Sequence, residues 1–137
     1  MPIESVVADA NVLLSAVTGK AALRVFTEFE VIVHVTQFNA AEVIEYLPVM
    51  ATNYELPMQF LEMQWKLLPL RIHAEGSYRR QLEKALSDLA KRDPEDAHAL
   101  ALARRLELPL WSNDRDLCGF DVDCYSTARL LAALRKA

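Results

Sequence analysis

Short apolar runs alternate with amphipathic stretches along most of this chain of 137 residues. Runs rich in β-branched residues, such as VIVHV, predict buried strands, whereas leucines at helical spacing predict helices. We expect strands at residues 3–8, 31–35, 68–73, 109–112 and 121–125. We expect helices at residues 20–29, 38–50, 57–68, 77–91, 93–106 and 127–136.

The alternation of strands and helices indicates the fold class. Strand–helix–strand units join parallel strands through right-handed crossovers and cover both faces of the sheet with helices. We therefore expect an α/β fold with a central, mainly parallel sheet of about five strands flanked by helices. The chain length suits one domain, which we place at residues 1–137. In such sheets, ligands bind outside the carboxyl ends of the strands.

Four acidic residues stand beside apolar runs, at or near the ends of the predicted strands. Asp9 and Asp114 follow strands, Glu42 lies one turn into a helix, and Asp96 lies in the first turn of another. If the fold brings these acids together, several like charges share one small space, which is unfavourable unless a divalent cation neutralises them. Oxygen ligands suit Mg²⁺ or Mn²⁺, and Mg²⁺ needs only one or two direct carboxylates.

Each of these acids also has a purely structural interpretation. Asp9 can end a strand and cap a turn, and Glu42 can be an ordinary surface residue of its helix. Asp96 can balance a helix dipole, and Asp114 can form a turn. The hypothesis of a shared site rests on all four occurring together at the appropriate ends of their elements.

The charge of the chain is unevenly distributed. The net charge of −4 does not by itself indicate a nucleic-acid-binding protein. Residues 1–65 hold 2 basic and 8 acidic side chains, whereas residues 66–105 hold 9 basic and 6 acidic ones. The basic side chains of this middle segment, among them Arg79, Arg80 and Lys84, either form a solvated helix surface or follow the phosphates of RNA.

Two further features bear on the cellular compartment. No apolar run approaches the roughly 20 residues that cross a bilayer, and the N-terminal sequence MPIESVVAD lacks the features of a signal peptide. Cys118 and Cys124 form neither a disulfide framework nor a zinc-ligand set. We expect a cytoplasmic protein, without membrane contact, in which both cysteines are reduced and partly buried.

Three stretches of the sequence together resemble the PIN domain, the nuclease fold of VapC-type toxins. The opening VVADANVLLSAV resembles a hydrophobic strand followed by D-x-N or D-x-S, and the region from Thr36 to Glu42 resembles the segment that supplies a second acid. DPEDAHALALARRLELPLWSNDRDL resembles the most recognisable stretch of the family, in which an acid opens an alanine-rich helix that leads to a strand and T/S-x-D-x-D. The resemblance covers nearly the whole chain.

This resemblance implies a PIN-like three-layer fold and a function. It implies an endoribonuclease dependent on Mg²⁺ or Mn²⁺, a homodimer, and, in toxin members, inhibition by an antitoxin protein. The implied catalytic residues are Asp9, Glu42, Asp96 and Asp114, the implied metal ligands are Asp9, Asp96, Asp114 and Asp116, and the implied supporting residues are Asn11 and Ser112.

The sequence departs from the family pattern in a few places. Leu117 stands where many members have phenylalanine, and residues 51–92 match no strong family pattern. Asp93 and Glu95 compete with Asp96 as the third acid, and Glu45 competes with Glu42. The alternative function is a non-catalytic PIN-like module that binds RNA or protein. A phosphotransfer receiver domain is disfavoured, because RIHAEGSY after the third strand has no acceptor aspartate.

Overall fold

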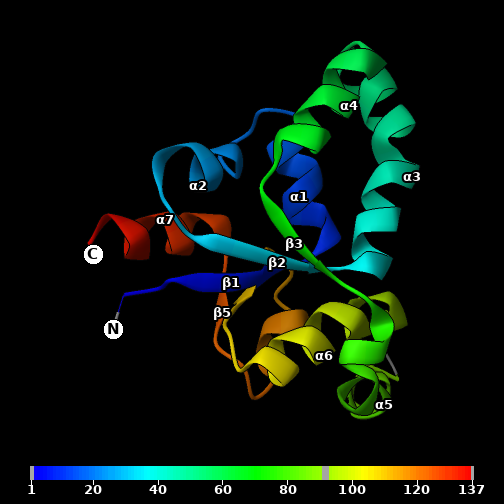
Figure 1. Cartoon of the computed structure of the whole chain (residues 1–137), viewed down its shortest axis with the longest axis vertical. Helices are drawn as coiled ribbons and strands as arrows, with labels where there is room; N and C mark the ends of the chain where they lie inside the picture. The colour runs from blue at the N-terminus through cyan, green and yellow to red at the C-terminus, as the bar shows by residue number, and fades with distance from the viewer. Residues whose placement is uncertain (1, 91–92, 137) are drawn as a thin grey trace.

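The computed structural model describes residues 2–90 and 93–136 and contains one sheet of five strands, in the order β3-β2-β1-β4-β5 (Figure 1). All four strand pairings are parallel, as the sequence predicts. The central strand β1 pairs with β2 on one side and with β4 on the other, so that Val7 lies opposite both His34 and Leu110. The strands are β1 (Ser5–Ala8), β2 (Ile32–Thr36), β3 (Leu70–His73), β4 (Leu110–Trp111) and β5 (Cys124–Tyr125).

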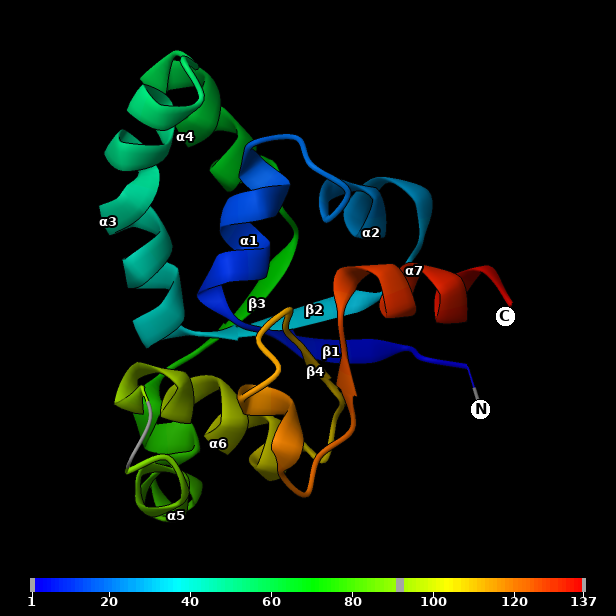
Figure 2. The same ribbon diagram turned by 180° about the vertical axis from the view of Figure 1, so that it is seen from behind.

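Helices cover both faces of this sheet. In Figures 1 and 2, α1, α2 and α7 lie on one face, α5 and α6 lie on the other, and α3 and α4 extend away from the sheet side by side. The α-helices of the described residues are α1 (Ala10–Val17), α2 (Leu23–Glu28), α3 (Gln37–Asn53), α4 (Met58–Leu67), α5 (Arg79–Asp88), α6 (Ala97–Leu106) and α7 (Thr127–Arg135). Three short 3₁₀ turns, η1 (Glu75–Ser77), η2 (Pro94–Asp96) and η3 (Leu117–Gly119), lie in the connections.

The sheet separates two apolar layers. Successive residues of a strand point to opposite faces, so Val6 and Ala8 of β1 pack against α1 and α7, whereas Val7 packs against α5 and α6. All three side chains are fully buried. Strand β1 is therefore held from both sides, which makes it a rigid support for the residue that follows it, Asp9.

The main difference from the expected elements is α1, which the sequence analysis did not predict. Five of its eight residues are buried, and a helix of eight residues is shorter than the window over which a helical period is read from a sequence. The predicted helix at 77–91 is shorter, since α5 ends at Asp88, and residues 91 and 92 lie outside the described residues. No helix of the described residues is long and apolar enough to cross a membrane.

The cysteines also differ from expectation. Cys118 and Cys124 form a disulfide, whereas the sequence analysis expected two reduced thiols. The short segment from η3 to β5 folds back on itself and brings the two Cα atoms to 5.2 Å, a separation that suits a disulfide. The bond links the segment that follows Asp114 to the edge strand β5.

Candidate functional site

Three helices begin at the carboxyl edge of the sheet. The first residues of α1, α3 and α6 lie close to one another in both ribbon views (Figures 1 and 2). Asp9 caps α1, Thr36 caps α3, and Asp96 stands at the start of α6. Because the N-terminal end of a helix carries a partial positive charge, this edge favours acidic side chains and bound anions.

Asp9 is the most buried acid of the site, with 5% of its surface exposed. One carboxylate oxygen accepts the backbone N–H of Val12 at 3.0 Å, and the other accepts the hydroxyl of Ser112. Burial raises the pKa of Asp9, the charge of Asp114 raises it further, and the two hydrogen bonds oppose the rise. Each carboxylate oxygen has two lone pairs, so Asp9 retains the capacity to bind a cation.

Ser112 connects Asp9 to Asp114. It is almost fully buried at the end of β4, and its hydroxyl donates to Asp9 while its oxygen accepts the backbone N–H of Asp114 at 3.0 Å. One carboxylate oxygen of Asp114 in turn accepts the backbone N–H of Asp116 at 2.9 Å. The turn after β4 is therefore organised around the Asp114 carboxylate.

Asp96 lies against Asp114. The half-buried Asp96 carboxyl has its pKa raised to about 7, first by burial, then by the charges of Asp93, Asp114 and Asp9, and by a hydrogen bond with the Asp114 side chain. Two carboxyl groups in hydrogen-bond contact share a proton or a cation more readily than they both ionise. Asp9, Asp96 and Asp114 thus form one electrostatically linked group.

Glu42 belongs to a neighbouring group of acids. Asn39 donates a side-chain hydrogen bond of 2.7 Å to Glu42. The pKa of Glu42 is raised to about 7, mainly by burial and also by Glu95 and Asp93, whereas the bond from Asn39 opposes the rise. Glu95 and Asp93 were rivals of Asp96 in the sequence. In the structure both raise the pKa of Glu42, and Asp93 also raises the pKa of Asp96, so Asp93 belongs to both groups of acids.

A pocket of about 200 Å³ joins the two groups of acids. Asn11 contributes to its wall. Asp114, Ser112, Asp116 and Glu45 do not line it, so Asp114 reaches the pocket only through its contact with Asp96. The residues that line the pocket are Asp9, Ala10, Asn11, Leu14, Asn39, Glu42, Tyr46, Asp93, Glu95 and Asp96.

The donor set fits a hard divalent cation with a partly hydrated coordination shell. Within residues 2–90 and 93–136, no three acidic, histidine or cysteine side chains lie close enough to hold one ion directly. Mg²⁺, however, usually keeps several waters and takes only one or two protein carboxylates, which the neighbouring Asp96 and Asp114 supply. The ion pairs found in the described part of the chain involve Glu28, Asp88 and Asp121, so none of them neutralises these acids.

Sequence reasoning missed the hydrogen-bonded residues behind Glu42. The Thr36 hydroxyl donates to the side-chain oxygen of Asn39 at 2.8 Å, and Thr36 also hydrogen-bonds Tyr78. The Tyr78 hydroxyl lies 2.8 Å from Nδ1 of His98. The T-x-x-N spacing of Thr36 and Asn39 is a recognisable helix-cap signal, but the contacts of Tyr78 and His98 depend on tertiary packing.

Comparisons with known proteins agree with this architecture. The family model described as PIN domain matches residues 7–135. A comparison with curated proteins returned no match.

Among solved structures, a toxin-antitoxin complex from Klebsiella pneumoniae shares 17% identity and a TM-score of 0.66, with 89% of this chain and 97% of that chain covered. PAE2754 from Pyrobaculum aerophilum shares 17% identity and a TM-score of 0.72, with 98% of this chain and 91% of that chain covered. VapC20 from Mycobacterium tuberculosis, a toxin that cleaves the sarcin-ricin loop, shares 14% identity and a TM-score of 0.58. The match covers 85% of this chain and 96% of that chain. At these identities the likeness concerns the fold.

Proposed function

Because this chain belongs to the PIN domain family, we propose that it is a divalent-metal-dependent endoribonuclease that cleaves RNA phosphodiester bonds. The observation that supports this most directly is the grouping of Asp9, Asp96 and Asp114 at the carboxyl edge of β1 and β4. Burial and the charges of the neighbouring carboxylates raise the pKa values of Asp9 and Asp96, so the group favours a bound cation. A protein that only binds RNA has no need of such a crowded group of acids.

Each residue of the group has a proposed role. Asp96 and Asp114 would hold the Mg²⁺ or Mn²⁺ ion, and Asp9, oriented by Ser112, would add a negative charge that attracts it. A divalent cation supplies a more acidic bound water and stabilises the departing oxygen of the phosphodiester. Glu42, oriented by Asn39, would position the attacking water. Asp116 donates its backbone N–H to Asp114, so we assign it an orienting role.

The proposed partners follow from the exposed apolar surface and from the structural neighbours. Ile44, Val49, Met63, Leu67 and Ile72 of α3, α4 and β3 are each about half exposed or more. Such a surface is typical of protein–protein interfaces. We therefore propose a homodimer and, since one neighbour is a toxin-antitoxin complex, an antitoxin partner.

Asp9→Asn tests the proposed activity. Asparagine also caps helices well, so α1 should keep its start and the variant should retain the circular dichroism spectrum of the wild type. We expect Mn²⁺-dependent cleavage of RNA to fall by about 100-fold or more, because a charge that holds the cation is lost. The exposed Asp123→Asn variant is the control and should cleave at the wild-type rate. Undiminished cleavage by folded Asp9→Asn protein would refute the proposed site.

A further inference from the structure

Two aromatic side chains stand beside the acid pocket on α3. Phe38, Glu42, Glu45 and Tyr46 lie on one face of this helix, at the spacing i, i+4, i+7 and i+8. Phe38 is 37% exposed and Tyr46 is 47% exposed. With Ala41 and Glu95, these four residues line a second pocket of about 270 Å³. The two pockets share Glu42, Tyr46 and Glu95, so they adjoin each other.

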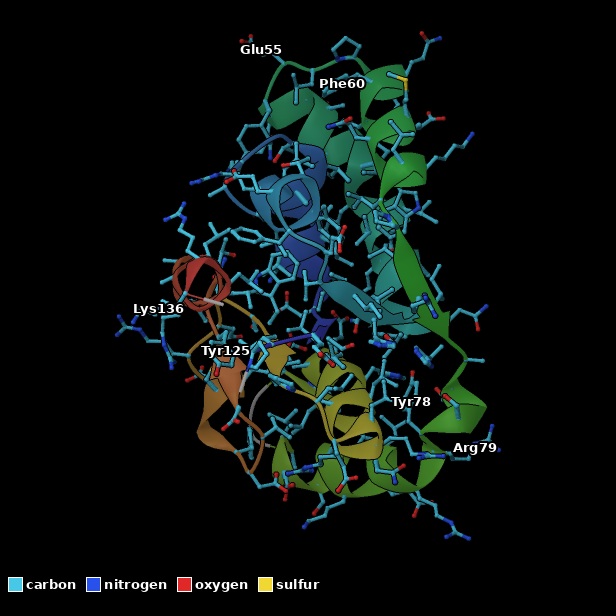
Figure 3. All side chains as sticks on the ribbon, turned by 60° about the vertical axis from the view of Figure 1, so that its left-hand side comes forward. Glu55, Phe60, Tyr78, Arg79, Tyr125 and Lys136 are labelled. Carbon is cyan, nitrogen blue, oxygen red and sulfur yellow. A yellow bond between two sulfur atoms is a disulfide. The ribbon has the colours of Figure 1, made fainter. Side chains whose placement is uncertain are left out.

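The ring of Phe38 is fixed in position by stacking on a buried side chain. It stacks on the ring of His98 with the centroids 4.0 Å apart and the planes within 7° of parallel. His98 is buried, and its Nδ1 is held 2.8 Å from the hydroxyl of Tyr78. Figure 3 shows Tyr78 beside α6, whereas the next residue, Arg79, extends towards solvent. Tyr78 is itself fully buried and packs edge-on against His98, so the partially exposed Phe38 ring rests on a ring whose position is fixed.

The chemistry of this second pocket selects a nucleobase over a phosphate. Glu42, Glu45 and Glu95 repel a phosphate group, but their carboxylates accept hydrogen bonds from the amino groups and ring N–H groups of bases. A flat aromatic ring provides the stacking surface that proteins use for unpaired bases of single-stranded RNA. A ring that is already fixed loses little conformational entropy when a base stacks on it.

We propose that Phe38 is the stacking platform for an unpaired nucleobase of RNA that lies next to the cleaved phosphate, with Glu45 and Glu95 accepting hydrogen bonds from the edge of that base. The proposal rests on the proposed ribonuclease function and adds a base-binding subsite to it. It also favours bases that carry an amino group, so cytosine, adenine or guanine should bind more tightly than uracil.

Binding of short single-stranded oligoribonucleotides, each of one base type and in the presence of a chelator, tests this subsite without cleavage. We expect Phe38→Leu to weaken binding by about 5- to 30-fold, the usual effect of losing one base stack. Phe38→Trp should bind at least as tightly as the wild type, and its added indole fluorescence should be quenched by the bound oligonucleotide. Tyr54→Leu, which removes an exposed aromatic ring at the other end of α3, is the matched control and should bind normally.

Cleavage assays separate this inference from the proposed function. With Mn²⁺, Phe38→Leu should raise KM while kcat stays nearly constant, because the lost interaction is present in both bound substrate and transition state. Equal binding by Phe38→Leu and the wild type, or unquenched Phe38→Trp fluorescence, would overturn the subsite even if the wild type cleaves RNA. Phe38-dependent RNA binding without any cleavage by the wild type would refute the enzyme and leave the subsite standing. Displacement of the indole signal by an arginine-rich peptide, with no response to RNA, would assign the pocket to a protein partner.

Discussion

Replacing Asp96 with asparagine should stabilise the metal-free protein at pH 8, although the same change removes a proposed metal ligand. The pKa of Asp96 rises from 3.8 to about 7, and each pKa unit corresponds to about 1.4 kcal/mol, so the ionised carboxylate costs about 4 kcal/mol. Since the side chain is only half-buried, solvent screening reduces this cost to about 2 kcal/mol. Loss of a negative charge at the start of α6 opposes the gain by about 0.5 kcal/mol. The Asp96 side chain makes no capping hydrogen bond that the substitution would break.

The direction of the stability change follows from the pH values at which Asp96 releases its proton in the unfolded and the folded chain. The unfolded chain releases the Asp96 proton near pH 4, whereas the folded chain holds it until about pH 7. Between these values the folded state binds more protons, so the stability of the wild type falls relative to Asp96→Asn as the pH rises. The stability difference should therefore be small near pH 4, grow through pH 5 to 7, and stay constant above pH 7.

Urea denaturation in the presence of a chelator measures this difference. At pH 8 we expect a free energy of unfolding about 1 to 2 kcal/mol higher for Asp96→Asn than for the wild type. The exposed Asp123→Asn variant should show no such gain. Added Mn²⁺ should stabilise the wild type more than Asp96→Asn, because only the wild type keeps both carboxylates of the proposed site. A variant less stable than the wild type at pH 8 would contradict the unfavourable burial and like-charge crowding inferred for the Asp96 carboxylate.

Three other predictions concern the scaffold. Glu107 has a φ of 56°, in the left-handed region that favours glycine. Glu107→Gly should therefore raise the free energy of unfolding by about 0.5–1 kcal/mol. A lower free energy of unfolding in urea denaturation would contradict this. Reducing the Cys118–Cys124 disulfide should lower the free energy of unfolding by about 2 kcal/mol, whereas a variant with both cysteines replaced by serine should not respond to the reductant. Trp111→Phe removes a buried hydrogen bond of 3.0 Å to the Thr127 hydroxyl and should cost about 1–3 kcal/mol; an unchanged melting temperature would show that this bond contributes nothing.

Much of the fold was accessible from the sequence because its signals are local. Each of the five strands overlaps its predicted range, and α6 lies within the helix predicted at 93–106, where the Asp-Pro-Glu-Asp segment forms a 3₁₀ turn before it. Helix α1 was missed because its eight residues are too few to establish a helical period. The Cys118–Cys124 disulfide was missed because it depends on how a turn folds back, which residue spacing alone does not indicate.

The acid group was predictable to a similar extent. Asp9 and Asp114 follow strands of a parallel sheet, so the general rule on the carboxyl edge was enough to predict that they lie close together. The sequence did not indicate which of the other acids lie beside Glu42, because Glu42 meets Glu95 only through the packing of α3 against the start of α6. The stacking of Phe38 on His98 was missed for the same reason.

The hydrogen bond between Ser112 and Asp9 determines how late in the synthesis of the chain the acid group can form. It joins two residues 103 positions apart, and Asp114 follows Ser112 directly in the same turn. During synthesis the N-terminal part of a chain emerges first, so Asp9 and Glu42 leave the ribosome long before β4 can pair with β1. An incomplete chain therefore holds only part of the acid group. If the folded domain cuts RNA, its own ribosome and messenger are protected until the segment with β4 and Asp114 has been translated and has joined the sheet.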